Sequence, residues 1–351
     1  MASLHGRGVT SVALKILIAE IGDNTPSVCA REILNKEPQF TIAAIAKCIF
    51  EAREKAERTR PNMICLDYEI QQIDYAPHLR KLTPLAIPIL IFSPLEKNGA
   101  KIALDALARG AMDFVVKPRG RDATIERDFI DKIRAASKSK IGQIATDKSP
   151  KLSAIAAQSS FARKIIAIGA STGGTEALKE VLIRIPKNSP GIVIVQHMPA
   201  NFTGPFAQRL NSLCQISVKE AKDGDEVLPS QALIAPGDRH MLLRKSASRY
   251  FVEIVSGEKV SGHRPSVDAL FYSVAQNAGA NAVGAILTGM GGDGARGLLK
   301  MREAGAKTVA QDEKTCVVFG MPKVAIELGA VDKIAPLEAL AAAALQFASE
   351  V

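Results

Sequence analysis

A chain of 351 residues, 47% of them hydrophobic, is long enough for two globular domains with a core each. It has no run of 18 uncharged apolar residues, and charge and glycine interrupt residues 1–12, so we expect neither a transmembrane helix nor a signal peptide, but a cytoplasmic protein. The net charge is +9, but basic and acidic residues are interleaved in both halves of the chain. Only 5% of residues are aromatic. Both features argue against nucleic-acid binding.

Residues 14–138 alternate between strand-like and helix-like segments. Strands are expected at residues 14–20, 40–46, 63–68, 87–93 and 112–118. The spacing of Ile125, Phe129, Ile130 and Ile133 predicts a last amphipathic helix. Five strands that alternate with helices are typical of a doubly wound α/β domain with a parallel sheet.

Residues 139–162 are rich in Ser, Lys, Ala and Gln and show little periodicity, so we interpret them as a linker. Strands and helices alternate again from Lys164 to about Phe347, which predicts a second α/β domain over residues 163–347. No internal repeat relates the halves. The five cysteines form no C-x-x-C pair and indicate reduced, mostly buried thiols, with no disulfide framework and no zinc site.

The segment K-I-I-A-I-G-A-S-T-G-G (164–174) places Ser171 between a predicted strand and a helix expected to start near Thr175. Gly173 and Gly174 permit a tight turn, and the helix N-terminus would direct free N–H groups and its dipole toward a developing negative charge. The pattern fits a serine nucleophile. It also fits a phosphate-binding turn, although it is not G-x-G-x-x-G and has no Walker lysine.

Histidine 197 follows the apolar run G-I-V-I-V-Q (191–196) at the end of another predicted strand. A single histidine is usually a surface or core residue. The carboxyl ends of parallel strands line one crevice, however, so we expect His197 near Ser171, where it would act as general base. His240 and His263 lie in predicted loops, either in the substrate cleft or simply at the surface.

A second glycine-rich turn, T-G-M-G-G-D-G, follows a strand expected to begin at Ala282 and carries Asp293 at its end. Asp293 is either the N-cap of the next helix or the carboxylate that orients an imidazole and stabilises the imidazolium. Met290 precedes it by three residues and could offer its backbone N–H to an oxyanion. The chain order Ser, His, Asp is no objection, because triads recur in several orders.

These motifs closely resemble the catalytic domain of the CheB family, the protein-glutamate methylesterases of bacterial chemotaxis. G-A-S-T-G-G, V-Q-H-M-P and L-T-G-M-G-G-D-G stand in the family's order, and I-A-P-G-D-R-H-M and R-P-S-V-D-A-L-F resemble its loops. The resemblance implies Ser171 as nucleophile, His197 as base, Asp293 as orienting carboxylate and Met290 as oxyanion donor, without a metal or other cofactor. It implies methyl-accepting chemotaxis receptors as partners, whose glutamate methyl esters are hydrolysed with release of methanol. Many members also deamidate receptor glutamines.

The N-terminal half resembles a response-regulator receiver domain with a flavodoxin-like five-stranded sheet, which implies a chemotaxis histidine kinase as a partner. Asp67 falls on the phosphoacceptor position, and Ser93 and Lys117 stand at the ends of the fourth and fifth strands. Where the family shows two adjacent acidic residues, this chain has Glu20-Ile21. Isoleucine offers Mg²⁺ no oxygen, and phosphoryl transfer to aspartate needs Mg²⁺, so Mg²⁺ binding is in doubt and phosphorylation of Asp67 stays open.

Two other interpretations of the chain remain. It could be a signalling adaptor whose esterase domain no longer acts, or a hydrolase of another acyl substrate such as a small ester. An intact triad argues against the first interpretation. Methanol release from a methylated receptor separates both from the methylesterase.

Overall fold

The computed structural model describes residues 13–21, 28–68, 76–93, 97–116, 123–138 and 163–350. The chain divides into two compact units, the first formed by residues 1–95 and 109–137 and the second by residues 96–108 and 138–351. Helix α4 (Lys97–Ala108) therefore groups with the second unit. The predicted domain boundaries stay predictions, and the predicted linker lies outside the described residues.

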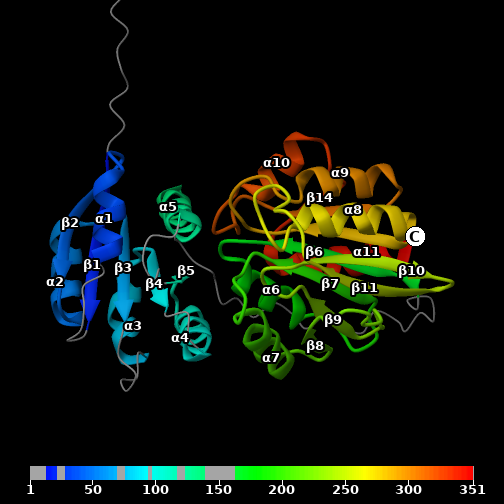
Figure 1. Ribbon diagram of the computed structural model, residues 1–351, viewed down its shortest axis with the longest axis horizontal. Coiled ribbons are helices and arrows are strands. Elements are labelled where there is room, and N and C mark those ends of the chain that lie inside the picture. Colours follow the sequence, from blue (N-terminus) through cyan, green and yellow to red (C-terminus); the bar gives the residue numbers. More distant parts are fainter. Residues whose placement is uncertain are drawn as a thin grey trace, which may run out of the picture. The chain divides into compact units, whose positions relative to one another are not determined.

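The first unit contains a five-stranded parallel sheet in the order β2-β1-β3-β4-β5 (Figure 1). Its strands are β1 (Leu14–Ile21), β2 (Phe40–Ala46), β3 (Met63–Tyr68), β4 (Ile89–Ser93) and β5 (Asp113–Val116). This is the strand order of flavodoxin-like sheets, so the predicted fold of the N-terminal half is confirmed. The fourth and fifth strands begin at Ile89 and Asp113, later than the predicted starts at residues 87 and 112.

Helices of the first unit pack on this sheet through their apolar faces. Their bounds are α1 (Val28–Lys36), α2 (Ile49–Thr59), α3 (Ala76–Leu82) and α5 (Ala123–Lys138). The predicted amphipathic helix is α5, which buries Phe129 and Ile133 in the core formed with the strands. The Phe129 ring lies 5.0 Å from that of Phe92, centroid to centroid.

The second unit is built on a seven-stranded parallel sheet in the order β14-β13-β12-β6-β7-β9-β8. Its strands are β6 (Ile165–Ala170), β7 (Gly191–Gln196), β8 (Ser217–Glu220), β9 (Gln231–Ile234), β12 (Ala282–Ile286), β13 (Lys307–Gln311) and β14 (Lys333–Ala335). The chain leaves β6 toward β7 and later returns to β12 on the other side of β6. Such a reversal of strand order opens a crevice at the carboxyl ends of the strands, the usual ligand site of these sheets.

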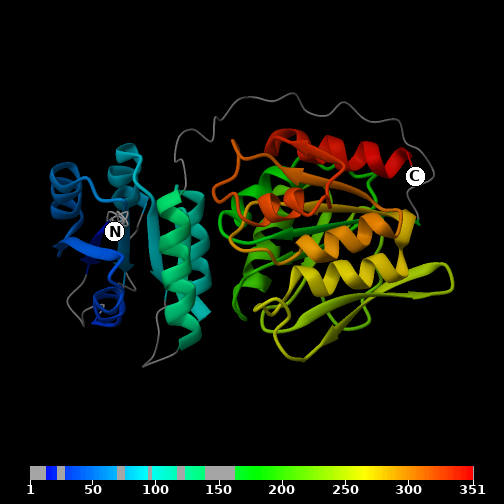
Figure 2. The same cartoon turned by 90° about the horizontal axis from the view of Figure 1, so that it is seen from above.

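Helices cover both faces of this sheet, as the predicted doubly wound fold requires (Figures 1 and 2). One face carries α6 (Gly174–Leu182), α7 (Thr203–Leu213) and α11 (Leu337–Glu350). The other carries α8 (Val267–Asn277), α9 (Ala295–Glu303) and α10 (Met321–Glu327). A hairpin of β10 (His240–Ser246) and β11 (Arg249–Val255) packs beside α8.

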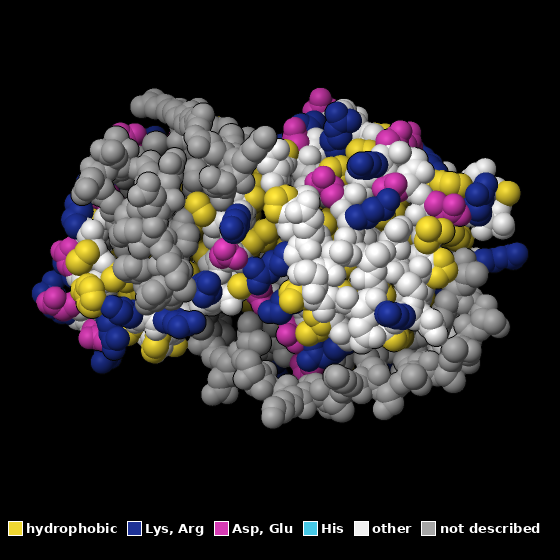
Figure 3. Space-filling model, turned by 90° about the horizontal axis from the view of Figure 1, so that it is seen from below, with side chains coloured by type: hydrophobic (Ala, Val, Ile, Leu, Met, Phe, Trp, Pro, Cys, Tyr) yellow, Lys and Arg dark blue, Asp and Glu magenta, His cyan; other side chains and the backbone are white. Residues whose placement is uncertain are grey.

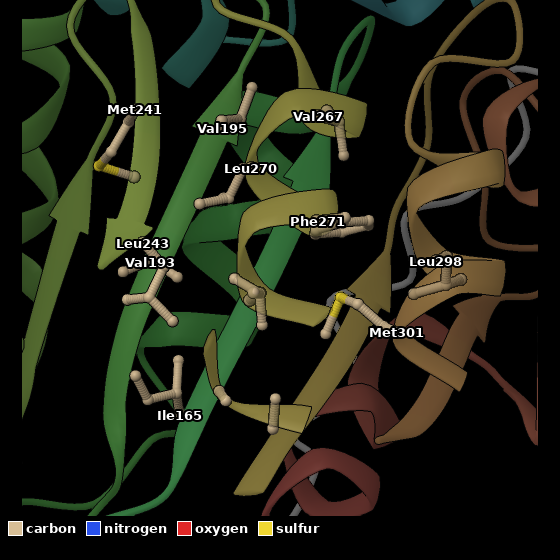
Figure 4. Packing of buried hydrophobic residues seen from close by; sticks show 14 of the residues in the cluster. Ile165, Val193, Val195, Met241, Leu243, Val267, Leu270, Phe271, Leu298 and Met301 are labelled. Carbon is tan, nitrogen blue, oxygen red and sulfur yellow. The ribbon is translucent and has the colours of Figure 1, made fainter. Parts of the chain in front are cut away.

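A cluster of apolar side chains fills the core between the central strands and α8 (Figure 4). Val193 and Val195 of β7 contact the cluster that contains Leu270 and Phe271 of α8, and Leu298 of α9 closes it. Both faces of β6 and β7 are buried, which explains the apolar runs at residues 165–170 and 191–195. The polar side chains of the site therefore lie at or beyond the ends of these two strands.

The surface drawn in Figure 3 carries Lys and Arg side chains interspersed with Asp and Glu. Within the described ranges, no helix combines the length and the apolar character needed to cross a membrane. The described cysteines are free thiols. Burial is confirmed for Cys65 and Cys316, whereas Cys214 is partly exposed and Cys48 is exposed.

Candidate active site

Serine 171 directly follows β6 in a turn held by main-chain hydrogen bonds. Its N–H donates to the Thr288 carbonyl over 3.0 Å, and its own carbonyl accepts from the Gly174 N–H over 2.7 Å. Gly173 caps α6 with a left-handed φ of 76°, and a Cβ there would lie 2.6 Å from Cβ of Val317. Only glycine fits this position, which explains the glycine pair that the sequence shows after the serine.

Backbone N–H groups near Ser171 have no hydrogen-bond partner among the described residues. They belong to Thr172 and Gly173 at the start of α6 and to Met290 in the loop after β12. That loop is anchored on both sides of Gly289, whose N–H donates to Val318 and whose carbonyl accepts from Met321. Open donors at a helix N-terminus can bind an oxyanion or a phosphate, so this feature alone does not choose between the two.

Histidine 197 directly follows β7, and its ring is fixed from two sides. Nε2 donates to Oδ2 of Asp293 over 2.7 Å, and the ring stacks on that of His263 with centroids 3.8 Å apart. Nδ1 is buried and has no hydrogen-bond partner among the described residues. Because the carboxylate assigns the proton to Nε2, Nδ1 keeps a lone pair and is the basic nitrogen.

Aspartate 293 is 2% exposed, and its carboxylate accepts hydrogen bonds from the first turn of α8. Oδ1 accepts from Ser266 Oγ (2.8 Å) and Asp268 N (2.9 Å), and Oδ2 accepts from Val267 N (2.8 Å). Asp293 therefore accepts hydrogen bonds from a helix N-terminus, as an N-cap residue does, but that helix is α8 and not the helix that follows Asp293. The helix that follows Asp293, α9, is capped by Gly294 without a side-chain bond.

The surroundings of Asp293 keep its carboxyl ionised. Burial alone would raise its pKa, but the hydrogen bond and charge of His197 and the N–H groups of Asp268 and Val267 outweigh burial and hold the pKa below the ordinary value. The positive end of the α8 dipole acts in the same direction. The carboxylate can therefore stabilise an imidazolium at neutral pH.

Two of the three triad residues follow strands directly, as predicted. Asp293 does not, because β12 ends at Ile286 and a loop runs from there to α9. Ala170 and Gln196, the last residues of β6 and β7, are register partners in the sheet. Ser171 and His197 directly follow them, so strand pairing determines where these two residues lie. Asp293 is placed by its contacts with α8.

His240 lies elsewhere than the sequence predicts, and several residues that support the site carry no signal in the sequence. His240 is buried rather than at the surface, and it begins β10 rather than lying in a loop. Its Nδ1 accepts from the Ser266 N–H (3.2 Å) and its Nε2 donates to the Glu258 carbonyl (2.9 Å). It thereby supports the segment that binds Asp293. Ser266 and Asp268 stand in the R-P-S-V-D motif, but no spacing in the sequence indicated that they contact Asp293.

The first unit gathers its predicted site residues at the carboxyl edge of its sheet. Glu20 and Asp67 are register partners in β1 and β3, and buried Ser93 ends β4. The side chains of Ile21 and Asp67, and all of Lys117, lie outside the described residues.

The Glu20 carboxylate does not fit a Mg²⁺ site. Arg31 binds both of its oxygens, with Nε 2.8 Å from Oε1 and Nη2 2.7 Å from Oε2, and Lys47 Nζ lies 2.5 Å from Oε2. Burial would raise the pKa of Glu20, but Lys47 and Arg31 more than compensate and lower it. Two cations thus occupy the carboxylate that a divalent ion would need, and the next residue, Ile21, adds no oxygen ligand.

Comparison with known proteins identifies the family. A model of the CheB methylesterase family matches residues 166–344. The chain belongs to the CheB methylesterase family. A protein-glutamate methylesterase/protein-glutamine glutaminase of Sulfurimonas denitrificans is 45% identical over an alignment of 341 residues, and the match covers 93% of this chain and 96% of that protein. One of Syntrophus aciditrophicus is 48% identical over an alignment of 335 residues, and the match covers 93% of this chain and 97% of that protein.

Structural comparison agrees for the second unit. The crystal structure of the Thermotoga maritima CheB methylesterase catalytic domain is similar with a TM-score of 0.51 and 40% identity. The similarity covers 54% of this chain and 98% of that domain. Family membership therefore rests on the sequence of most of the chain and on the fold of the unit that carries Ser171, His197 and Asp293.

Proposed function

We propose that the chain is a cytoplasmic protein-glutamate methylesterase that hydrolyses γ-glutamyl methyl esters on methyl-accepting chemotaxis receptors. The relatives bear this name together with that of protein-glutamine glutaminase. One observation carries the proposal: the Asp293–His197 hydrogen bond leaves His197 Nδ1 as a buried base at the strand end next to Ser171. The fold brings a hydroxyl, an imidazole and a carboxylate to one edge, as acyl transfer requires.

The first half of the reaction forms an acyl-enzyme. His197 Nδ1 takes the proton of the Ser171 hydroxyl, and Oγ attacks the ester carbonyl carbon. The N–H of Met290 and the open N–H groups of the Ser171 turn hold the resulting oxyanion; donors of this kind contribute about 3 kcal/mol each. Asp293 stabilises the imidazolium. The C–O bond to the methoxy group then breaks, and methanol leaves with the proton from His197.

The second half returns the enzyme to its starting state. Water gives a proton to His197 Nδ1 and attacks the acyl carbonyl. The C–Oγ bond of the tetrahedral intermediate then breaks, which releases the glutamate, and His197 returns the proton to Ser171 Oγ. A receptor glutamine follows the same course with ammonia as leaving group. No step needs a metal or other cofactor, because the chain supplies nucleophile, base and oxyanion donors.

Replacing Ser171 with Ala tests the proposal. Methanol release from a methyl-labelled chemoreceptor fragment should fall to the uncatalysed rate, because no nucleophile remains, while circular dichroism stays unchanged. Ser212→Ala, which removes an exposed hydroxyl on α7, is the control and should react like the wild type. Near wild-type turnover of Ser171→Ala would show that the triad is wrong. Activity on generic esters alone would favour the other hydrolase class, and a wild type without activity would favour the adaptor.

We propose that the first unit regulates this esterase and that a chemotaxis histidine kinase is one of its partners. The register of Glu20 and Asp67 supports the receiver-like arrangement. The ion pairs of Glu20 with Arg31 and Lys47 argue that this unit does not use Mg²⁺ as other receivers do.

A further inference from the structure

Glutamine 196, the last residue of β7, is 3% exposed and contacts the main chain of both Ser171 and His197. Its Nε2 donates to the Ser171 carbonyl over 2.8 Å and to the His197 carbonyl over 3.2 Å. Carbonyl oxygens only accept, so the two contacts determine which end of the amide faces them. One side chain thus joins the nucleophile turn to the turn of the base.

The contact with Ser171 also orients the peptide group between Ser171 and Thr172. In a trans peptide the C=O and the following N–H point in opposite directions. The Ser171 carbonyl is held by Gln196 Nε2 and by the Gly174 N–H, so the direction of the Thr172 N–H is determined as well. That N–H is one of the open donors of the turn.

The opposite side of Ser171 is held by a second buried glutamine. Gln311, at the end of β13, accepts from the Thr288 N–H over 2.8 Å, and the Thr288 carbonyl accepts from the Ser171 N–H. Gln311 also donates to the Thr315 carbonyl, so both ends of its amide are paired. Ser171 is therefore held through its N–H by Thr288, in the loop after β12, and through its C=O by Gln196 of β7.

Unlike Gln311, Gln196 is not fully paired. Its Oε1 is buried without a hydrogen-bond partner among the described residues, which disfavours folding. The amide fits only because residue 174 is glycine: a Cβ there would lie 2.1 Å from Oε1. Stability alone gives little reason for this arrangement, and local violations of this kind are expected at functional sites.

We infer that Gln196 is a positioning residue for the acyl transfer described under the proposed function, on which this inference rests. Its Nε2 fixes the Ser171–Thr172 peptide and the main chain of His197 relative to each other. The nucleophile, the base and an oxyanion donor can then all reach the ester carbonyl at the same time. Misplacement of reacting groups by about 1 Å is enough to cost about 100-fold in rate.

The test compares Gln196→Met with Gln231→Met in the full chain. Met has a similar size but no donors. Gln231, at the start of β9 in the same sheet, also has a buried Oε1 without a partner, so it matches Gln196 in kind but lies at the opposite end of its strand. Gln196→Met should lower kcat for methanol release about 100-fold with KM and Tm nearly unchanged, and Gln231→Met should leave kcat intact.

Labelling of Ser171 by a fluorophosphonate provides a readout that does not depend on the substrate. Its rate should fall in parallel with kcat in Gln196→Met. If the wild type is labelled but releases no methanol, the proposed function fails, and labelling still decides the role of Gln196.

Wild-type labelling and turnover in Gln196→Met, or an equal loss in Gln231→Met, would overturn the inference. Gln196→Glu keeps the shape but offers only acceptors when ionised, and it should lose at least as much activity. If neither Gln196 variant folds, the residue is structural and the inference is wrong.

Discussion

His197 presents its two nitrogens in the reverse order of the trypsin-like triad. There, Nδ1 binds the carboxylate and Nε2 serves the serine. Here Nε2 binds Asp293, and Nδ1 is the free nitrogen. The imidazole is symmetric enough for both arrangements, because each leaves one N–H donor and one acceptor. The roles of a triad therefore follow from its contacts rather than from atom names.

Asp293→Asn should lower turnover by up to about 10⁴-fold, as in the serine-protease precedent. An amide in place of Oδ2 would offer His197 a donor and favour the tautomer protonated on Nδ1, which cannot act as base. An amide in place of Oδ1 would instead face the Asp268 N–H. Steady-state methanol release measures the loss, and an unchanged rate would reduce Asp293 to a cap of α8.

The same carboxylate should make the second unit sensitive to acid. Its pKa in the folded protein lies below the ordinary value of 3.8, so its contribution to stability is complete above about pH 4 and is lost as the pH falls through the folded pKa. Asp268 acts in the opposite sense, because burial raises its pKa. Between about pH 5 and pH 3, Tm should therefore fall less in Asp293→Asn than in the wild type; equal losses would contradict this.

Among the elements, α8 determines where the acidic member of the triad lies. Its first turn presents three donors to Asp293, from Ser266 Oγ and the N–H groups of Val267 and Asp268. A helix N-terminus needs such acceptors, and the carboxylate of a distant loop supplies them. Asp293 thus gains its position from a helix that precedes it in the chain.

Ser266→Ala should destabilise the second unit by about 2 kcal/mol, because Ser266 caps α8 through Ala269 N and also donates to the Asp293 carboxylate. The corresponding fall in Tm is about 5 °C for a unit of this size. Turnover should fall as well, since Asp293 loses one of its donors. Urea unfolding measures the change, with exposed Ser212→Ala as control; equal stability of the two variants would contradict the prediction.

At the scale of the whole molecule, the two units share a fold class but differ in how they use their strand ends. The second unit places a hydroxyl, an imidazole and a carboxylate there. The first places Glu20 there, already paired with Arg31 and Lys47. A divalent ion would have to displace two cations and do without a ligand from Ile21.

A small phosphodonor with Mg²⁺ should therefore stimulate the wild-type esterase little, and Asp67→Asn should change little more. Ile21→Asp combined with Arg31→Gln should increase labelling of Asp67, because it adds an oxygen ligand and removes one competing cation. Radiolabel incorporation and methanol release measure the two effects, with Asp67→Asn added to the double variant as control. Strong, Asp67-dependent stimulation of the unmodified protein would contradict the prediction that the first unit binds Mg²⁺ weakly.

The sequence by itself determined the α/β class, the strands at 40–46 and 63–68 and the turns that follow β6 and β7. Period and turn chemistry are local properties, so buried strands and glycine pairs are visible in a linear chain. The motifs also sufficed to recognise the CheB family. The starts of β4 and β5 were less exact, because strand ends depend on neighbouring strands.

Only the tertiary structure decided which atoms face one another. It placed Asp293 on the first turn of α8, set Nε2 of His197 against it, buried His240 and paired Glu20 with Arg31 and Lys47. These contacts join residues far apart in the chain, and each exists because buried polar groups and charges must find partners once the core has formed. The spacing of residues along the sequence does not indicate which donor binds which acceptor, since several donors could have bound each acceptor.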